Sequence, residues 1–224
     1  MVRAWVLTAL IATVLLGWAP GAAAASGCGD FGGTLAADGL CRAHESQPEY
    51  EMDVSFPLDY PDQRAITDFI TSTREEFVAA AHDPQAHNLP YRMEMKATEA
   101  ATATTRSVAF EVYQNVGGAH PSTWYRTFNY DLIRQRPLGF ADLFAPGARP
   151  VPELLPIVQR ELTSRLGVPD LVSPTAGLDP ASYQSFAITD EALIFYFDRG
   201  AIMAGAAGAH TVSVPRSALP PLVV

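Results

Sequence analysis

The chain has little positive charge. Lys96 is its only lysine, and its 224 residues hold 15 lysines and arginines against 24 aspartates and glutamates, a formal net charge of −9. Nucleic-acid binding calls for a basic stripe, and adhesion to anionic lipid calls for a cluster of basic side chains. The charge balance therefore argues against both kinds of partner.

Familiar signatures of catalysis and metal binding are also missing. The sequence has no Gly-x-Ser-x-Gly elbow, no His-Glu-x-x-His, no Cys-x-x-Cys and no glycine-rich phosphate loop followed by lysine. Isolated pairs such as His44-Glu45, and the cluster of His82, Asp83 and His87, are read as solvated side chains. We therefore expect no metal and no cofactor, and an enzyme only if its site is unorthodox.

Only one long hydrophobic run occurs, and it lies at the N-terminus. Arg3 precedes an apolar stretch from Ala4 to Trp18, and small residues follow at Ala22–Ala25. This order is typical of a cleaved export signal, and the run is too short for a membrane span of about 20 residues. We expect a signal peptide over residues 1–25, cleaved near Ala24 or Ala25, and a secreted mature domain over residues 26–224 without a membrane span.

Cysteine is nearly absent as well. Cys28 and Cys41 are the only two, and both survive the predicted cleavage. Export places them in an oxidising compartment, so we predict a disulfide, which for so short a loop stabilises by about 3 kcal/mol. The alternative is a lipoprotein anchored through an acylated Cys28, which would leave Cys41 unpaired.

The hydrophobic periodicity predicts two helices. Pro61 and Asp62 suit a helix start, and apolar residues recur at helical spacing to about His82. A second stripe ends at Leu166, where Gly167 is a stop signal, and Pro156 is expected in the first turn of that helix.

Strand-like alternation is more frequent than helical spacing. Residues 26–46 read as irregular, and 98–105 as a loop or an edge. Mixed strands and helices without a steady βαβ repeat predict an α+β fold in one domain, with an antiparallel or mixed sheet packed by the two helices. The predicted strands are 51–56, 91–95, 107–114, 122–131, 185–190, 193–198 and 211–214.

The centre of the predicted sheet is a long hairpin rich in aromatic residues, with its turn over 115–121. Alternation along a strand places Tyr113 and Tyr125 on the opposite face from Trp124 and Phe128. If the face of Tyr113 and Tyr125 is open, it would be an aromatic platform for an extracellular protein or a cell-wall glycan, and the candidate binding residues of the hairpin are Trp124, Tyr125 and Tyr113. If a helix covers it, they are core.

The turn of the hairpin supplies the catalytic candidates. His120 could act as a general base near neutral pH, and Ser122 two residues later could be a nucleophile. The alternative is structural: the glycines and Pro121 shape the turn, and His120 bonds its own backbone.

Six blocks of sequence occur in order along the chain: Tyr60-Pro61-Asp62-Gln63, Val112-Tyr113-Gln114-Asn115, Gly117-Gly118-Ala119-His120-Pro121, Pro156-Ile157-Val158-Gln159, Ala176-Gly177-Leu178-Asp179-Pro180 and Val214-Pro215-Arg216-Ser217. With these blocks the chain closely resembles the family of the major secreted immunogenic protein of the tuberculosis group, the Mpt sixty-four antigen, from about Cys28 to Leu219. The Gly-Gly-Ala-His turn, with Phe186-Ala187-Ile188-Thr189 through Phe195-Tyr196-Phe197-Asp198, also resembles the extracellular domain of RsiV, an anti-sigma factor that binds lysozyme, and the RsiV-like module would span about 107–219.

The resemblance implies an exported α+β protein, with some mycobacterial relatives described as esterases. We expect a secreted, cofactor-free, monomeric protein that acts by binding a host or cell-wall partner. The first alternative is a secreted serine carboxylesterase, and the second is a sensor or inhibitor that binds lysozyme.

Overall fold

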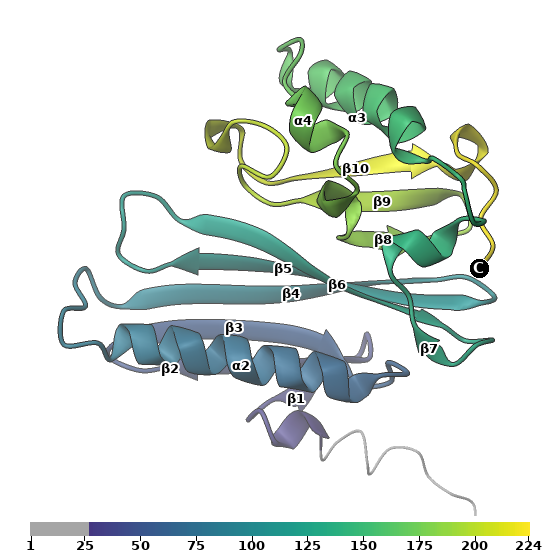
Figure 1. Ribbon diagram of the computed structural model, residues 1–224. Coiled ribbons are helices and arrows are strands. Elements are labelled where there is room, and N and C mark those ends of the chain that lie inside the picture. The colour runs from purple at the N-terminus through teal and green to yellow at the C-terminus, as the bar shows by residue number, and fades with distance from the viewer. Residues whose placement is uncertain (1–26) are drawn as a thin grey trace, which may run out of the picture.

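The computed structural model describes residues 27–224 and contains two sheets with helices on their outer sides (Figure 1). The predicted signal peptide lies outside these residues. The fold is α+β, as the sequence predicts. No helix within residues 27–224 combines the length and the apolar character that crossing a membrane would require.

The larger sheet has seven strands, in the order in which they occur along the chain. Neighbouring strands are antiparallel except β3 and β4, which are parallel and are joined by a crossover through helix α2, Gln63–Ala81. The strands are β1 (Thr34–Leu35), β2 (Leu40–Ser46), β3 (Tyr50–Pro57), β4 (Tyr91–Ala101), β5 (Thr105–Asn115), β6 (Ser122–Asp131) and β7 (Arg136–Pro137).

The smaller sheet has three antiparallel strands in the order β10-β9-β8. It lies above β5 and β6 in Figure 1, with helices α3 and α4 on its far side. Its elements and connections are η1 (Phe140–Leu143), α3 (Val151–Leu166), α4 (Pro174–Gly177), η2 (Pro180–Tyr183), β8 (Phe186–Ile188), β9 (Ala192–Phe197), η3 (Gly205–Ala207), β10 (His210–Pro215) and η4 (Arg216–Ala218).

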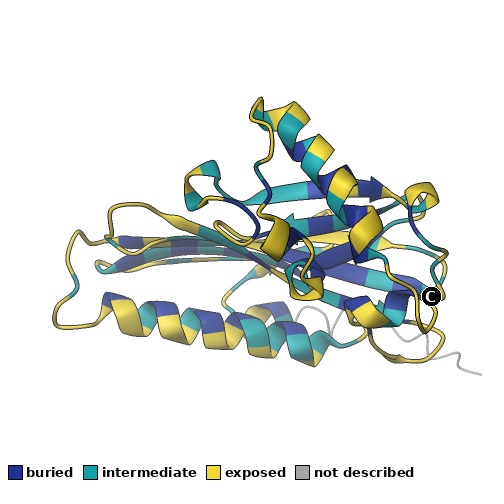
Figure 2. Cartoon of the chain, turned by 45° about the horizontal axis from the view of Figure 1, so that its top comes forward, coloured by how far each residue is buried: buried dark blue, intermediate teal, exposed yellow. Residues whose placement is uncertain are grey.

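Helix α2 covers one face of the larger sheet. Its buried side is built on Ile66, Ile70 and Phe77, and Figure 2 shows buried residues recurring along the helix while its outer side is exposed. Asp62 is the N-cap, with its Oδ1 accepting from Ala65 N at 3.4 Å. The helix therefore begins two residues after Pro61, because the capping aspartate stands between them.

Helix α3 packs on the smaller sheet, so of the two predicted helices only α2 covers the hairpin. Leu154, Val158 and Leu162 are fully buried against the β8–β10 strands. Pro156 lies inside the helix, not in its first turn, because α3 begins at Val151 with Pro152 in the first-turn position that proline favours. Gly167 ends it in a left-handed conformation, as predicted.

Two stretches that the sequence predicted as irregular contain strands. Residues 34–46 form β1 and β2, and residues 98–101 extend β4, with only three residues before β5 begins. Both stretches are strands because neighbouring strands supply their hydrogen-bond partners, although their small and polar side chains have low strand propensity.

Cys28 and Cys41 form the predicted disulfide, which joins the N-terminal segment to β2. Gly33 passes so close that a Cβ atom there would lie 2.8 Å from Cys41 Sγ and 2.9 Å from Cys28 Sγ. Only glycine permits this approach of the backbone to the disulfide.

A buried polar network joins the two sheets. Ser107 Oγ in β5 donates to Asn129 Oδ1 in β6 at 2.6 Å, and Asn129 Nδ2 donates to the Phe186 carbonyl in β8 at 2.8 Å. Ser107 Oγ also accepts from Ile188 N at 3.1 Å. The network satisfies the backbone of the β8 edge with side chains of the larger sheet, and so fixes one sheet against the other.

Candidate active site

The structure places His120 in the exposed turn between β5 and β6, and Ser122 at the exposed first position of β6. Within residues 27–224 no hydrogen bond joins the two side chains, and no carboxylate lies behind His120 in the way that a catalytic triad requires. The turn is held instead by Asn88 Nδ2, which donates to the Gly117 carbonyl at 2.9 Å.

The aromatic residues of the hairpin lie on two faces, as strand alternation predicts. Trp124 and Phe128 face α2, where their rings lie 5.8 and 5.7 Å from that of Phe69. On the other face the Tyr125 ring lies 5.2 Å from Tyr196 of β9, so the smaller sheet covers Tyr125 and leaves it 8% exposed. Tyr113 on that face stays partly exposed.

Carboxylates surround Tyr125 on this covered face. Its backbone N–H donates to Asp198 Oδ1 at 2.7 Å, and its hydroxyl donates to Glu111 Oε2 at 3.4 Å. Burial, with the nearby Glu111 charge, raises the pKa of Tyr125 to about 12, and burial also raises the pKa of Asp198. The phenol therefore stays protonated and acts here as a hydrogen-bond donor.

A second group of polar side chains lies where the smaller sheet does not cover the larger one, on strands β2, β3 and β4. A cavity of about 450 Å³ opens there, and we call its polar lining the β2–β4 polar pocket. The cross-strand register places these side chains on one face. They are Arg42, His44, Asp53, Ser55 and Lys96.

The best-defined contact in the pocket joins His44 to Asp53. The two residues are directly opposite each other on β2 and β3, and His44 Nδ1 lies 2.8 Å from Asp53 Oδ1. An ionised carboxylate can only accept, so Nδ1 carries the proton and Nε2 of a neutral ring is left as a base. Both side chains are open to solvent, at 60% and 48% exposure.

Two hydroxyls lie close to this pair in the register, Ser55 on β3 and Thr34 on β1, and Ser55 is the one on the same strand as Asp53. It is two residues beyond Asp53 on the same face of β3, and it lies opposite Arg42 and beside Lys96. Diagonal neighbours on adjacent strands have Cβ atoms no more than about 7–8 Å apart. No hydrogen bond joins Ser55 to His44 in the described residues, so a change of side-chain rotamer is needed to bring Oγ to Nε2.

Two cations flank the hydroxyl. Lys96 Nζ bonds Glu94, which raises the pKa of Lys96 and lowers that of Glu94, and Arg42 pairs with Asp38 at the edge of the pocket. Both cations stay charged at neutral pH. The arrangement offers a hydroxyl, a base with an orienting carboxylate and a positive field for a developing oxyanion.

The grouping of His44, Asp53 and Ser55 was not predicted from the sequence, because β2 was not predicted. Without β2, His44 has no partner strand, and its alternation with Arg42 carries no meaning. The residues that could have indicated it are Asp53 and Ser55, which share one face of the correctly predicted strand β3. Within residues 27–224 no three His, Cys, Asp or Glu side chains converge as a metal site would require.

Comparison with known proteins identifies relatives over most of the chain. A family model described as “Protein of unknown function (DUF3298)” matches residues 141–217. The esterase Rv3036c of Mycobacterium tuberculosis is 46% identical over 219 residues, which cover 96% of each chain. The immunogenic proteins MPB64 of Mycobacterium bovis and MPT64 of Mycobacterium tuberculosis are each 37% identical over 183 residues, 80% of each chain.

The fold also has a solved counterpart. The crystal structure of a DUF3298 family protein from Pseudomonas aeruginosa PAO1 aligns with a TM-score of 0.54 at 16% identity. The alignment covers 83% of this chain and 94% of that one. At this identity the likeness concerns the fold alone.

Proposed function

The chain belongs to the family of the mycobacterial immunogenic proteins MPB64 and MPT64, and from this premise we propose that it is an exported carboxylic ester hydrolase acting through Ser55, His44 and Asp53. The observation that carries the proposal is the 2.8 Å pair of His44 and Asp53 beside a hydroxyl on an open sheet face. The 46% identity to a protein named as an esterase supports the same reaction class.

The chemistry follows the general logic of an activated serine. Ser55 Oγ attacks the ester carbonyl carbon while His44 Nε2 takes the hydroxyl proton. The proton then passes from His44 to the leaving alkoxide, which departs as the alcohol and leaves an acyl group on Ser55. A water molecule, deprotonated by His44, attacks that acyl group, and His44 returns the proton to Ser55 Oγ as the acid is released.

The position of the site on a strand determines how the oxyanion is stabilised. The backbone N–H groups of β3 take part in the pairing with β2 and β4, and so are not free to form an oxyanion hole of the elbow type. The charged side chains of Lys96 and Arg42 are the available alternative. Because the pocket is open to water, we expect turnover of short, activated esters.

The test is hydrolysis of p-nitrophenyl acetate and butyrate by the purified protein. We expect Ser55→Ala and His44→Ala each to lower kcat/KM by about 100-fold or more, and Asp53→Asn to lower it less. Ser122→Ala and His120→Ala are matched controls that should retain activity within about twofold, since the structure gives them no triad. Circular dichroism checks that each variant is folded.

Two results would count against this assignment. Full activity in Ser55→Ala together with a loss in Ser122→Ala would move the site to the turn of the hairpin. An inactive wild-type protein would reject the hydrolase and leave the binding function as the better explanation.

Extracellular binding of a protein or a cell-wall glycan is the second candidate function. Of the predicted contacts Tyr113, Tyr125 and Trp124, only Tyr113 is left partly exposed on the face away from α2, because the smaller sheet covers Tyr125 and Trp124 packs on α2. The observation that favours it is the partly exposed Tyr113 on the same face as the Glu111 carboxylate. Sedimentation with isolated peptidoglycan, compared between wild type and Tyr113→Ala, tests the glycan. Calorimetry with lysozyme tests the sensor alternative.

Export remains part of the proposal, with a signal peptide over residues 1–25 and a monomeric mature domain that needs no cofactor. The disulfide is typical of an oxidising compartment. It occupies the Cys28 sulfur that a lipid anchor would require, which favours free secretion over anchoring. The mass of the exported protein distinguishes cleavage near Ala25 from acylation at Cys28.

A further inference from the structure

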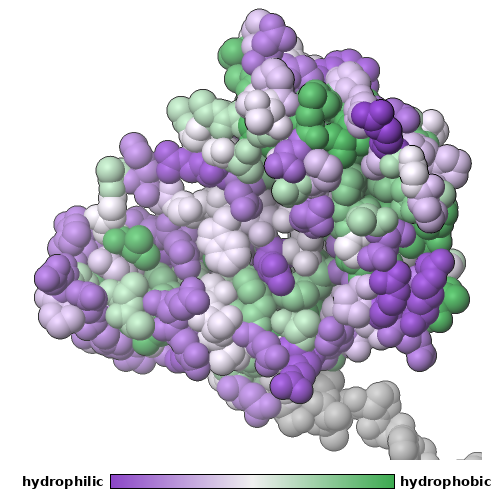
Figure 3. Space-filling model, viewed as in Figure 1, coloured by the Kyte–Doolittle hydropathy of each residue, from purple (hydrophilic) through white to green (hydrophobic). Residues whose placement is uncertain are grey.

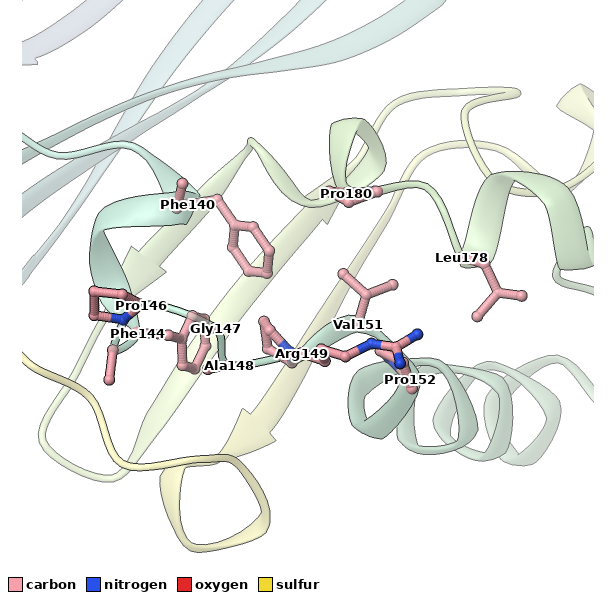
Figure 4. A pocket seen from close by; sticks show the side chains of 13 residues that line it. Phe140, Phe144, Pro146, Gly147, Ala148, Arg149, Val151, Pro152, Leu178 and Pro180 are labelled. Atoms are coloured by element: carbon pink, nitrogen blue, oxygen red, sulfur yellow. The ribbon is translucent and has the colours of Figure 1, made fainter.

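A cavity of about 580 Å³ opens in the smaller-sheet region, away from the residues of the β2–β4 polar pocket. Its walls come from η1, the connection 144–150, the start of α3, Leu178 directly after α4 and the start of η2, and Figure 4 shows their side chains arranged around it. The volume falls within the roughly 300–1,000 Å³ of small-molecule sites. The wall residues used below are Phe140, Phe144, Val151, Leu178 and Pro180.

The walls of the cavity are apolar and well supported. Phe140 and Phe144 lie with their ring centroids 5.6 Å apart, and Phe140 also packs on Tyr183 and Phe195 of the core. The rings are therefore held in place from behind while they line the cavity. In Figure 3 hydrophobic surface is visible in the part of the molecule where α3 and α4 lie.

Leu178 forms the outer wall and is 51% exposed, although it faces an apolar cavity. A leucine in this position leaves apolar surface in water that an apolar ligand would cover. Among the residues that line the cavity there is no serine, histidine or carboxylate that could react with a substrate. The cavity is therefore suited to binding and not to catalysis.

One charge lies at the cavity, the guanidinium of Arg149. No carboxylate of the described residues pairs with it, whereas Arg136 of β7 is held by Asp142 at 2.8 Å. The N-terminus of α3 begins two residues later without a capping side chain, and its dipole adds a positive field that Glu153 in the first turn partly offsets. An anionic group at Arg149 would complete the site.

We propose that this cavity binds a medium-chain fatty acid, with the alkyl chain against Phe140, Phe144 and Leu178 and the carboxylate on Arg149. Apolar walls beside a single unpaired cation match the chemistry of one negative head on a hydrocarbon chain. This site is separate from the proposed hydrolase site, and neither proposal depends on the other.

The test is isothermal titration calorimetry of the protein with dodecanoate below its micelle concentration. We expect saturable binding of one molecule, with acetate too short to bind and dodecanol binding more weakly than dodecanoate. Arg149→Ala should weaken dodecanoate binding by about tenfold and leave dodecanol binding unchanged, since it removes only the charged contact.

Leu178→Asp should abolish binding of both ligands, because it places a negative charge in the apolar wall at an exposed position where folding is not at risk. Arg160→Ala is the matched control: this arginine is exposed on α3 and does not line the cavity, so its removal should change nothing. Ser55→Ala should bind dodecanoate like the wild type, which separates this test from that of the hydrolase.

Absence of saturable dodecanoate binding would overturn the proposal. Binding that is equal in wild type, Arg149→Ala and Leu178→Asp would also overturn it, because the fatty acid would then be held elsewhere on the surface.

Discussion

The two sheets differ in how their second face is covered. The larger sheet buries one face under α2 and leaves the β2–β4 part of the other face polar and open. The smaller sheet has α3 on one side and the strands β5 and β6 on the other, so its hydrophobic core is closed, and the cavity beside Arg149 is lined mainly by apolar side chains. A sheet face that is open to water carries polar groups, and a face packed on a core is mainly apolar.

This difference separates two kinds of chemistry within one domain. Titratable and nucleophilic side chains meet on the larger sheet because cross-strand register brings residues of β2, β3 and β4 together. The smaller-sheet region has a mainly apolar cavity beside Arg149 instead. The two hydrophobic cores are distinct, and the buried network of Ser107 and Asn129 is a polar link between them.

The largest loss of stability is expected from creating a cavity in either hydrophobic core. Phe56→Ala in the larger region and Phe195→Ala in the smaller one each remove a fully buried ring, so each should destabilise by about 3–5 kcal/mol. If the two regions unfold as one unit, each variant shifts the urea midpoints measured by far-UV circular dichroism and by fluorescence equally. Trp124 is the only tryptophan in residues 26–224, so fluorescence reports on the larger sheet.

A Phe195→Ala variant in which the circular dichroism changes at low urea while the Trp124 signal stays at its wild-type midpoint would contradict this. It would show that the two regions unfold independently. The two sheet regions would then be separate folding units and not parts of one cooperative unit.

Removal of the polar link between the sheets is expected to cause the next largest loss of stability. Asn129→Ala removes the bonds to Ser107 Oγ and the Phe186 carbonyl and leaves both partners buried, so we expect a loss of about 2–3 kcal/mol. Amide exchange of β8 should rise more than that of β3. Asn115→Ala, at the exposed end of β5, is the control and should change stability by less than about 0.5 kcal/mol. Equal exchange in β3 and β8 would mean that the network does not hold the sheets together.

The strands of the fold were more predictable than their assembly. Alternation of apolar and polar residues identified β3, aromatic and β-branched residues identified β6, and Gly167 marked the end of α3. The sequence alone could not place α3 on a second sheet, since an amphipathic stripe specifies that a face is buried but not against what. It also missed β2, whose polar side chains follow no strand pattern until β3 pairs with them.

The same limit applies to the candidate site. His44 and Asp53 are nine residues apart, and only the register of β2 on β3 makes them neighbours. His120 attracted attention because it is adjacent to glycines and Pro121 in the sequence, whereas the structure leaves it in an exposed turn. Local sequence reveals turns, but a constellation across strands depends on pairing that it does not encode locally.

The smallest effect concerns acid stability at the end of the larger sheet. Asp131 accepts from the backbone N–H groups of Arg134 and Ile133 and from the Arg134 guanidinium. These bonds, the Arg134 N–H first, hold the pKa of Asp131 below its ordinary value of 3.8. The folded state therefore gains stability from the ionised form above pH 3.8 and loses it as the pH falls through the lower, folded pKa.

We expect Asp131→Asn to cost about 1 kcal/mol at pH 7, and the gap to the wild type to close as the pH falls from 4 to 2. Urea unfolding across that range is the measurement. A gap between wild type and Asp131→Asn that widens in acid would have the wrong sign for this explanation.

Covalent labelling shows whether Ser55, on the open face of the larger sheet, is a reactive nucleophile. A fluorophosphonate reacts with an activated serine and leaves a stable adduct, which peptide mapping by mass spectrometry assigns to one residue. We expect an adduct on Ser55 that is lost in His44→Ala and unaffected by Ser122→Ala. An adduct on Ser122 or on any other serine, with Ser55 unmodified, would contradict it.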